Sequence, residues 1–180
     1  MTRARAERAG TPPAAPDGSS ESRSRLAFAR DLAGPSIAVL ALAVAAGLAM
    51  ISAELLLVFS VDVGATSCEA TASPDVSDFC ATTGGERHSY ALVVLGLFTL
   101  AMAWGATAGR SRPAGVALVL VGVVVLAITL LGDLPDASAE GVIGMRYEAA
   151  SASPALGLWM ELAGGVLAVA AGALRLGRPG

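Results

Sequence analysis

The stretch from Ser36 to Ser60 constrains this chain more than any other part of its sequence. It reads SIAVLALAVAAGLAMISAELLLVFS and contains one formally charged residue, Glu54. A helix needs about 20 mostly apolar residues to cross the hydrocarbon core of a membrane, and this stretch is long enough. A carboxylate inside such a segment is costly and indicates a functional residue. We therefore expect a membrane protein with a polar position in its first span.

Three more apolar stretches follow, and together the four predict spans at about 37–60, 90–108, 114–132 and 154–174. Only GRSRP joins the second span to the third, which predicts that these two helices run antiparallel. Charged residues make up 15% of the chain, against about 25% in a typical soluble domain. The sequence therefore predicts an all-α, polytopic membrane protein, in which residues 35–176 form an antiparallel bundle of four transmembrane helices.

The arginines predict the orientation of these spans. All 12 basic residues are arginine, and ten fall on one side of the predicted membrane: Arg3, Arg5, Arg8, Arg23, Arg25, Arg30, Arg110, Arg112, Arg175 and Arg178. An excess of basic residues marks the cytoplasmic side. We expect a multi-pass protein of the inner (cytoplasmic) membrane, in contact with the lipid bilayer, with both termini in the cytoplasm. Residues 1–34, rich in Arg, Pro and Ala, are predicted to be a disordered cytoplasmic tail.

Two cysteines lie in the first of two predicted outer loops, which cover residues 61–89 and 133–153. The outer side is oxidising, so we expect a disulfide between Cys68 and Cys80. A redox pair is the alternative, but the spacing is not that of a C-x-x-C motif. Two cysteines with a single histidine fall short of a usual zinc ligand set. The sequence therefore predicts no metal site and no cofactor.

A second carboxylate, Glu161, lies in the fourth span. Glu54 and Glu161 lie equally far from the outer ends of their predicted spans, about 10 Å inside at 1.5 Å per residue. Small residues share the helix face of Glu161 and allow close packing: Gly157, Gly164, Gly165 and Ala168. We expect the two carboxylates to face each other. They form either a hydrogen-bonded clasp between helices or a site for a proton, another cation or a basic partner.

Further polar residues are predicted at the outer mouth of the bundle: His88, Tyr90, Asp133, Asp136 and Arg146. His88 is the only histidine, and it is either a sensor of external pH or an ordinary interfacial group. The two aspartates flank the turn DLPD and are either an external cation site or solvated residues at a helix end. Four residues predicted near the same outer level could partner the carboxylate pair: Arg87, His88, Tyr90 and Arg146.

Several segments resemble a group of small four-span membrane proteins from high-GC bacteria. They are HSYALVVLG, SRPAGVALVLVG, GDLPD, GVIGMRYEAASASP and the region around Glu161. The resemblance begins at His88 and covers roughly the second half of the chain. It implies a four-span topology and carries no activity.

The sequence excludes several classes of function. It contains no catalytic motif of the common hydrolase, metalloprotease, P-loop or dinucleotide-binding types, so we do not expect an enzyme. The net charge of -3 predicts no nucleic-acid partner. We expect a structural or accessory membrane component with a buried Glu pair, able to form homo- or hetero-oligomers through its small-residue helix faces. The alternatives are a small proton- or cation-coupled transporter or channel that uses Glu54 and Glu161, and an outer-face sensor.

Overall fold

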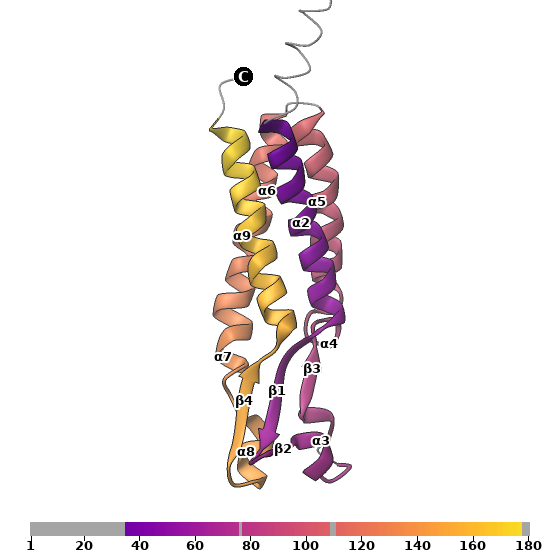
Figure 1. Ribbon diagram of the computed structural model, residues 1–180, viewed down its shortest axis with the longest axis vertical. Helices are drawn as coiled ribbons and strands as arrows, with labels where there is room; N and C mark the ends of the chain where they lie inside the picture. The colour runs from indigo at the N-terminus through magenta and orange to yellow at the C-terminus, as the bar shows by residue number, and fades with distance from the viewer. Residues whose placement is uncertain (1–34, 76, 109–110, 178–180) are drawn as a thin grey trace, which may run out of the picture. The chain divides into compact units, whose positions relative to one another are not determined.

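The computed structural model describes residues 35–75, 77–108 and 111–177, so the predicted tail lies outside the described residues. The described chain is mostly helical and contains a small antiparallel sheet (Figure 1). The long helices are α2 (Pro35–Leu55), α5 (Ala91–Thr107), α6 (Arg112–Ile128) and α9 (Leu156–Leu176). The strands and the short helices lie toward one end of the long helices, where α2 leads into the sheet.

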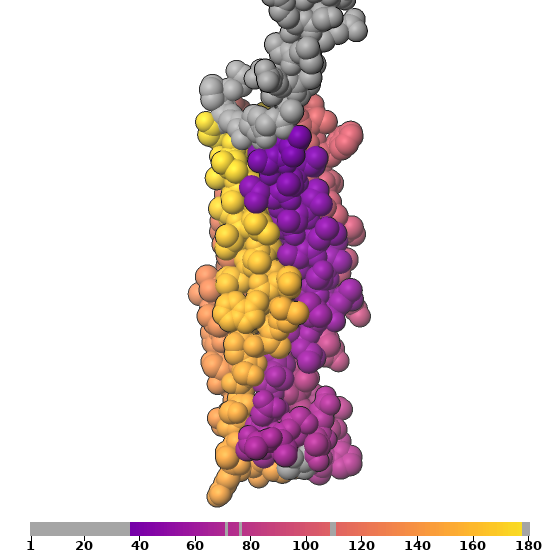
Figure 2. All heavy atoms as spheres, viewed as in Figure 1, coloured from indigo at the N-terminus to yellow at the C-terminus, as the bar shows by residue number. Residues whose placement is uncertain are grey.

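The four long helices pack side by side. Helix α2 contacts both α5 and α9, and α6 contacts α9 and α5. Figure 2 shows α2 and α9 in direct contact on one face of this arrangement. Small residues fill much of the space between the helices, because they let the backbones approach closely. The buried alanines of the four long helices are Ala43, Ala46, Ala53, Ala103, Ala106, Ala114, Ala168 and Ala171.

The outward faces of the helices are apolar. Exposed large side chains include Leu48, Val94, Leu97, Leu120, Val123, Leu131 and Val166. Three helical segments are long and apolar enough to cross a membrane, namely Ile37–Leu55, the run that begins at Arg112, and Leu156–Leu176. Helix α5 is also apolar but has 17 residues. Apolar surface of this extent suits lipid rather than water.

The predicted span boundaries need three corrections. The first span does not extend to Ser60, because α2 ends at Leu55 and strand β1 (Leu57–Val63) follows. Val61 and Val63 alternate there with Asp62, and this two-residue period is that of a strand. The third span is longer than predicted, since α6 continues through a π-helical turn, η2 (Thr129–Asp133), into α7 (Leu134–Asp136). The fourth span does not begin at Pro154, which is the last residue of a strand.

The two predicted outer loops, together with the end of the first predicted span, form a sheet that the all-α prediction missed. Its central strand, β1, pairs antiparallel with β2 (Thr66–Ser67), β3 (Ala81–Thr83) and β4 (Ala150–Pro154). The pairing with β4 is the longest and runs from Phe59 opposite Pro154 to Val63 opposite Ala150. Strand β1 therefore joins the two predicted outer loops, which are far apart in sequence.

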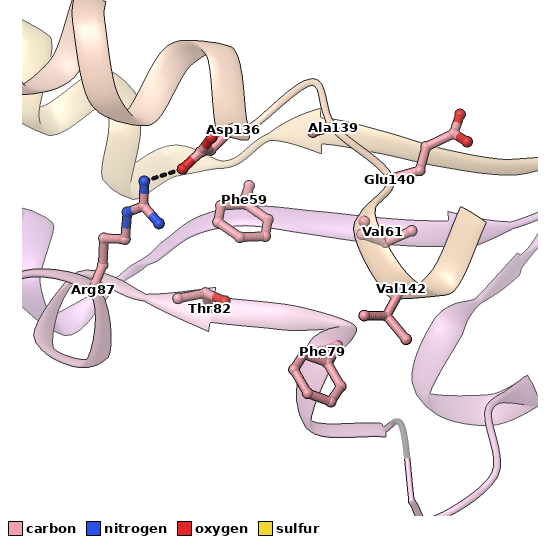
Figure 3. Close-up of a pocket in the computed structure, with 10 residues that line it drawn as sticks. Phe59, Val61, Phe79, Thr82, Arg87, Asp136, Ala139, Glu140 and Val142 are labelled. Atoms are coloured by element: carbon pink, nitrogen blue, oxygen red, sulfur yellow. Dashed lines mark hydrogen bonds and ion pairs between the residues drawn. The ribbon is translucent and has the colours of Figure 1, made fainter. Parts of the chain in front are cut away.

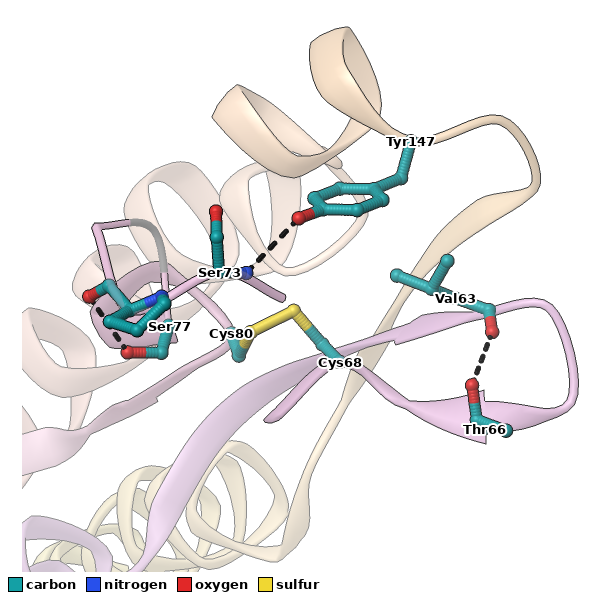
Figure 4. Close-up of a disulfide and its surroundings, with 8 residues drawn as sticks. Val63, Thr66, Cys68, Ser73, Ser77, Cys80 and Tyr147 are labelled. Atoms are coloured by element: carbon teal, nitrogen blue, oxygen red, sulfur yellow. Dashed lines mark hydrogen bonds between the residues drawn. A yellow bond between two sulfur atoms is a disulfide. The ribbon is translucent and has the colours of Figure 1, made fainter. Parts of the chain in front are cut away.

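The predicted disulfide between Cys68 and Cys80 is confirmed (Figure 4). Both cysteines are buried and pack with Val61 and Ile143, and Ile143 lies in helix α8 (Gly141–Arg146) of the second loop. The hydroxyl of Tyr147 accepts a hydrogen bond of 3.1 Å from the amide of Ser73. The bridge therefore stabilises a cluster to which both predicted outer loops contribute. Helix α3 (Cys68–Thr71) and the 3-10 turn η1 (Ser77–Phe79) complete this region.

Glycines set the spacing between α6 and α9. A Cβ atom on Gly122 would lie 2.6 Å from the carbonyl oxygen of Gly165, and one on Gly172 would lie 2.6 Å from that of Gly115. Both distances are far inside van der Waals contact with a backbone atom that cannot rotate away. These four glycines pack between helices of the same chain.

We predict that Gly122→Ala lowers the stability of the protein by about 1–3 kcal/mol, because the two helices must separate. Gly132→Ala is the matched control, since a Cβ there meets nothing within 4 Å. Alanine at that helical position should be neutral or slightly stabilising. Thermal unfolding in detergent measures both. Equal melting temperatures for the two variants would contradict the close packing of α6 against α9.

Candidate functional site

Four ionisable side chains lie buried where the long helices meet the sheet. They come from four different elements: Glu54 from the last turn of α2, His88 from α4 (Gly84–His88), Asp133 from η2, and Glu161 from α9. The side chains of Glu161 and Asp133 are 0% and 1% exposed, and that of His88 is 10% exposed. Glu54 is also buried. Burial of several ionisable groups together is costly and points to a functional site.

The short helix α4 is fixed at both ends. Thr83 and Glu86 form a capping box at its start, which satisfies two free backbone amides. Gly84 lies against the end of α2, where a Cβ would be 2.5 Å from the carbonyl oxygen of Ala53. Ser89 and Tyr90 then both adopt a positive φ and turn the chain into α5. Such backbone is unfavourable for residues other than glycine and is found often at functional sites.

Glu54 caps helix α5. Its Oε1 atom accepts a 2.7 Å hydrogen bond from the backbone amide of Leu92, in the first turn of that helix. Helix α5 has no cap from its own N-cap side chain, Tyr90. A carboxylate at this point satisfies a free amide and interacts favourably with the helix dipole. The main contact of Glu54 is therefore with α5 and not with Glu161.

Arg87 fixes the orientation of Asp133. Its Nε atom donates a 3.0 Å hydrogen bond to Oδ1 of Asp133, and its terminal nitrogen donates to Asp136. The hydrogen bond to Asp133 is the main cause of a raised pKa for the Arg87 guanidinium, which therefore stays charged. With Oδ1 held in this way, the other oxygen of Asp133 faces His88.

The remaining polar atoms of the cluster converge without forming hydrogen bonds. His88 Nε2 lies 3.4 Å from Oδ2 of Asp133 and 3.8 Å from Oε2 of Glu161. One ligand atom from each of these three residues lies within 4.8 Å of those of the other two. Neither oxygen of Glu161 has a hydrogen-bond partner among the described residues, and the same holds for these atoms of His88 and Asp133. Buried polar atoms without partners are expensive, at about 1–3 kcal/mol each and more when charged.

The residues predicted from sequence divide into two groups. His88, Asp133 and Glu161 come together, and Glu54 lies close enough to act on Glu161 electrostatically. Asp136 joins them through Arg87. Two candidates lie elsewhere. Tyr90 is 60% exposed with its ring near Gly85, and Arg146 forms a 2.7 Å ion pair with Asp75.

The prediction that no metal site exists rested on the cysteines, which are bonded to each other. The structure gives His88 two carboxylates as neighbours instead, and these three side chains form a possible metal-ligand set. Arg87 was expected near the carboxylates, but its hydrogen bonds to Asp133 and Asp136 were not predicted. Arg87 and His88 are adjacent in the sequence and precede an apolar span, which indicated a polar position there. The sequence did not reveal that Arg87 contacts Asp133 of η2.

A cavity of about 290 Å³ lies on the sheet side of this cluster (Figure 3). Phe59, Phe79 and Val142 supply part of an apolar lining, and Arg87 and Asp136 supply its charged edge. Arg87 lines the cavity together with Asp136, to which it donates a hydrogen bond. It also donates to Asp133 in the buried cluster. Arg87 therefore lies between the cavity and the cluster, and His88, Asp133 and Glu161 are not among the residues that line the cavity.

The helices are apolar on the other side of the cluster. Other buried polar residues in the described chain are Thr99, Thr129 and Arg175. The hydroxyls of Thr99 and Thr129 donate to carbonyl oxygens of their own helices. Between Thr99 and Arg175 the core contains Val39, Leu118 and alanines. The described residues therefore form no continuous polar path along the helices.

Comparisons with protein-family models, with curated proteins and with solved structures found no match to this chain. The resemblance to small four-span proteins stays a prediction. The function must be argued from the cluster itself.

We predict that Glu54→Leu lowers the stability by about 1–3 kcal/mol, because it leaves the buried amide of Leu92 without an acceptor. Glu54→Gln should cost much less, since the amide oxygen can still accept that hydrogen bond. Thermal unfolding of the purified variants measures the difference. If both substitutions lowered the melting temperature equally, the charge of Glu54 rather than its capping bond would be the important property.

Proposed function

We propose that this chain is a four-span accessory protein of the cytoplasmic membrane that binds a cation on its outer side. The cation occupies the cluster of His88, Asp133 and Glu161. One observation carries the proposal: Glu161 is fully buried, and both of its carboxylate oxygens lack hydrogen-bond partners. A bound cation would compensate these oxygens and the unpaired oxygen of Asp133 together.

The four-span topology is supported by the helices and by the arginines. Three helical segments meet the length and hydropathy of a span, and α5, with 17 residues, reaches the lower end of the usual range of about 17–25. Helix α5 is in contact with α2 along the same group of helices. The excess of arginines in the sequence before α2, around the connection between α5 and α6, and at the end of α9 supports a cytoplasmic location for both termini.

The contacts favour cation binding over a purely structural clasp at Glu161. A clasp requires hydrogen bonds across the helix interface, and Glu54 has such a bond to Leu92. Glu161 has none. We expected the two glutamates to act as a pair, but we propose different roles for them. Glu54 caps helix α5, and Glu161 binds the cation.

The apolar core argues against transport through the helices. A conducting path requires polar groups or water along its length, and the core between Thr99 and Arg175 is aliphatic in the described residues. Ions reach the cluster from the outer side and return there. Binding would link α4, η2 and α9, so the packing of the helices depends on whether the cation is bound. This supports an accessory or sensory role at the outer face.

The topology predicts the behaviour of reporter fusions. A reporter that is active only in the cytoplasm should be active after Gly180 and inactive when inserted near Asp75 in the first outer loop. Activity near Asp75 together with silence after Gly180 would reverse the orientation. The cation would then enter from the cytoplasm.

Cation binding predicts a ligand-dependent melting temperature. At about 100 times its Kd, a ligand stabilises the folded state by about 2.7 kcal/mol, or about 5–10 °C for a chain of this size. We expect acid or one of a series of metal salts to produce such a rise in the wild type, and Glu161→Gln to abolish it. The matched control is Glu148→Gln, the same change at an exposed residue of the second outer loop. A wild-type melting temperature that no cation changes would contradict the proposal.

A further inference from the structure

We infer that His88, Asp133 and Glu161 form a three-ligand site for a divalent transition-metal ion of the zinc class, with one coordination position open. The ligand atoms are Nε2 of His88, Oδ2 of Asp133 and Oε2 of Glu161. The inference rests on the cation site proposed above and names the ion that it selects. Its basis is the unpartnered, fully buried Glu161, which points into a cluster of metal-ligating groups.

The distances between the ligand atoms suit a small ion. Nitrogen and oxygen ligands lie about 2.0–2.2 Å from zinc, so two ligands at the tetrahedral angle are separated by about 3.4 Å. His88 Nε2 lies 3.4 Å from Asp133 Oδ2 and 3.8 Å from Glu161 Oε2. These separations are too long for hydrogen bonds with good geometry, yet short enough for an ion to bridge after small side-chain shifts.

The ligand types select the ion. Calcium takes six to eight oxygen ligands, and magnesium keeps several waters, so neither favours an imidazole in a buried, three-ligand site. Imidazole suits zinc, copper, iron and nickel. One histidine and two carboxylates, with a position left open, is closest to the three-ligand arrangement of zinc sites that also bind a water or another molecule.

A protonated His88 is the main alternative to a metal. Nε2 of an imidazolium carries one hydrogen, which can be donated to Asp133 or to Glu161 but not fully to both. A metal ion accepts lone pairs from the nitrogen and both carboxylates at once. Its two positive charges also balance these two carboxylates, while Arg87 stays paired with Asp133 and Asp136.

The surroundings of the ligands suit metal binding. Arg87 donates to Oδ1 of Asp133 and so holds Oδ2 toward the site, which is the kind of outer contact that orients a metal ligand. His88 remains 10% exposed, so the site is not fully closed to an ion. The three ligands belong to α4, η2 and α9, and a bound ion would tie these elements together.

The full-length protein in detergent, stripped with a chelator and dialysed, tests the inference with Co²⁺ and Zn²⁺. We expect one Co²⁺ per chain, the strong visible absorption of a low-coordinate site, displacement by Zn²⁺, and no comparable binding of Ca²⁺ or Mg²⁺. His88→Gln and Glu161→Gln should each weaken Co²⁺ binding by well over tenfold, and Arg87→Gln by about 10–100-fold through the orientation of Asp133. Glu148→Gln should bind as the wild type does.

The metal-free melting temperatures show whether each variant is folded, and Asp133→Asn provides a second ligand change if one variant fails to fold. Unchanged Co²⁺ binding in the folded variants, or no stoichiometric Co²⁺ in the wild type, would overturn the metal site. If acid or calcium still raised the wild-type melting temperature and Glu161→Gln removed that rise, the proposed cation site would survive. If no cation changed the melting temperature of the wild type, the metal site and the proposed cation site would both be contradicted.

Discussion

The position of Glu161 is the constraint on which the rest of this structure depends. A carboxylate that is 0% exposed and has no hydrogen bond raises the free energy of the folded state, and the neighbouring carboxylate of Asp133 adds to this cost. Other parts of the structure are arranged around that cost. Arg87 neutralises Asp133 from one side, and His88 is held between the two carboxylates by a short helix with a fixed start and an unusual turn at its end.

The antiparallel sheet makes this arrangement possible. Strand β1 continues directly from α2, and β3 returns the chain to the end of α2 immediately before α4. Strand β4 leads into α9 and so fixes where the helix that carries Glu161 begins. The disulfide and the cluster around Ile143 hold the two loops together. The sheet therefore determines the distance between His88 on α4 and Glu161 on α9, although no strand contributes a ligand.

The sequence predicted the helices better than the loops, for physical reasons. A span must satisfy its backbone internally and present apolar side chains to lipid, so long apolar stretches predict helices well. The first boundary failed because LLLVFS is apolar both as the end of a helix and as a strand, and hydropathy does not separate these. Strands β2, β3 and β4 are short and rich in Ser, Thr and Ala, and their pairing depends on contacts distant in sequence. The disulfide was predictable because the chain has only two cysteines, close together in one loop predicted to face an oxidising compartment.

The individual residues of the site were predicted from the sequence, but their grouping was not. Glu54 and Glu161 stood out because a charge in an apolar span is rare, and His88 and Asp133 stood out at the ends of spans. Their grouping was not predictable, because it depends on the turn at Ser89 and Tyr90 and on the π-helical turn that carries Asp133. Equal depth in the predicted spans suggested that the two glutamates form a pair. Helix α2, however, ends earlier than expected, and Glu54 accepts a hydrogen bond from the amide of Leu92 at the start of α5. A free helix terminus competes with any ligand for a nearby carboxylate. Glu54 is therefore engaged by a helix terminus, and Glu161 is the carboxylate that has no hydrogen-bond partner among the described residues.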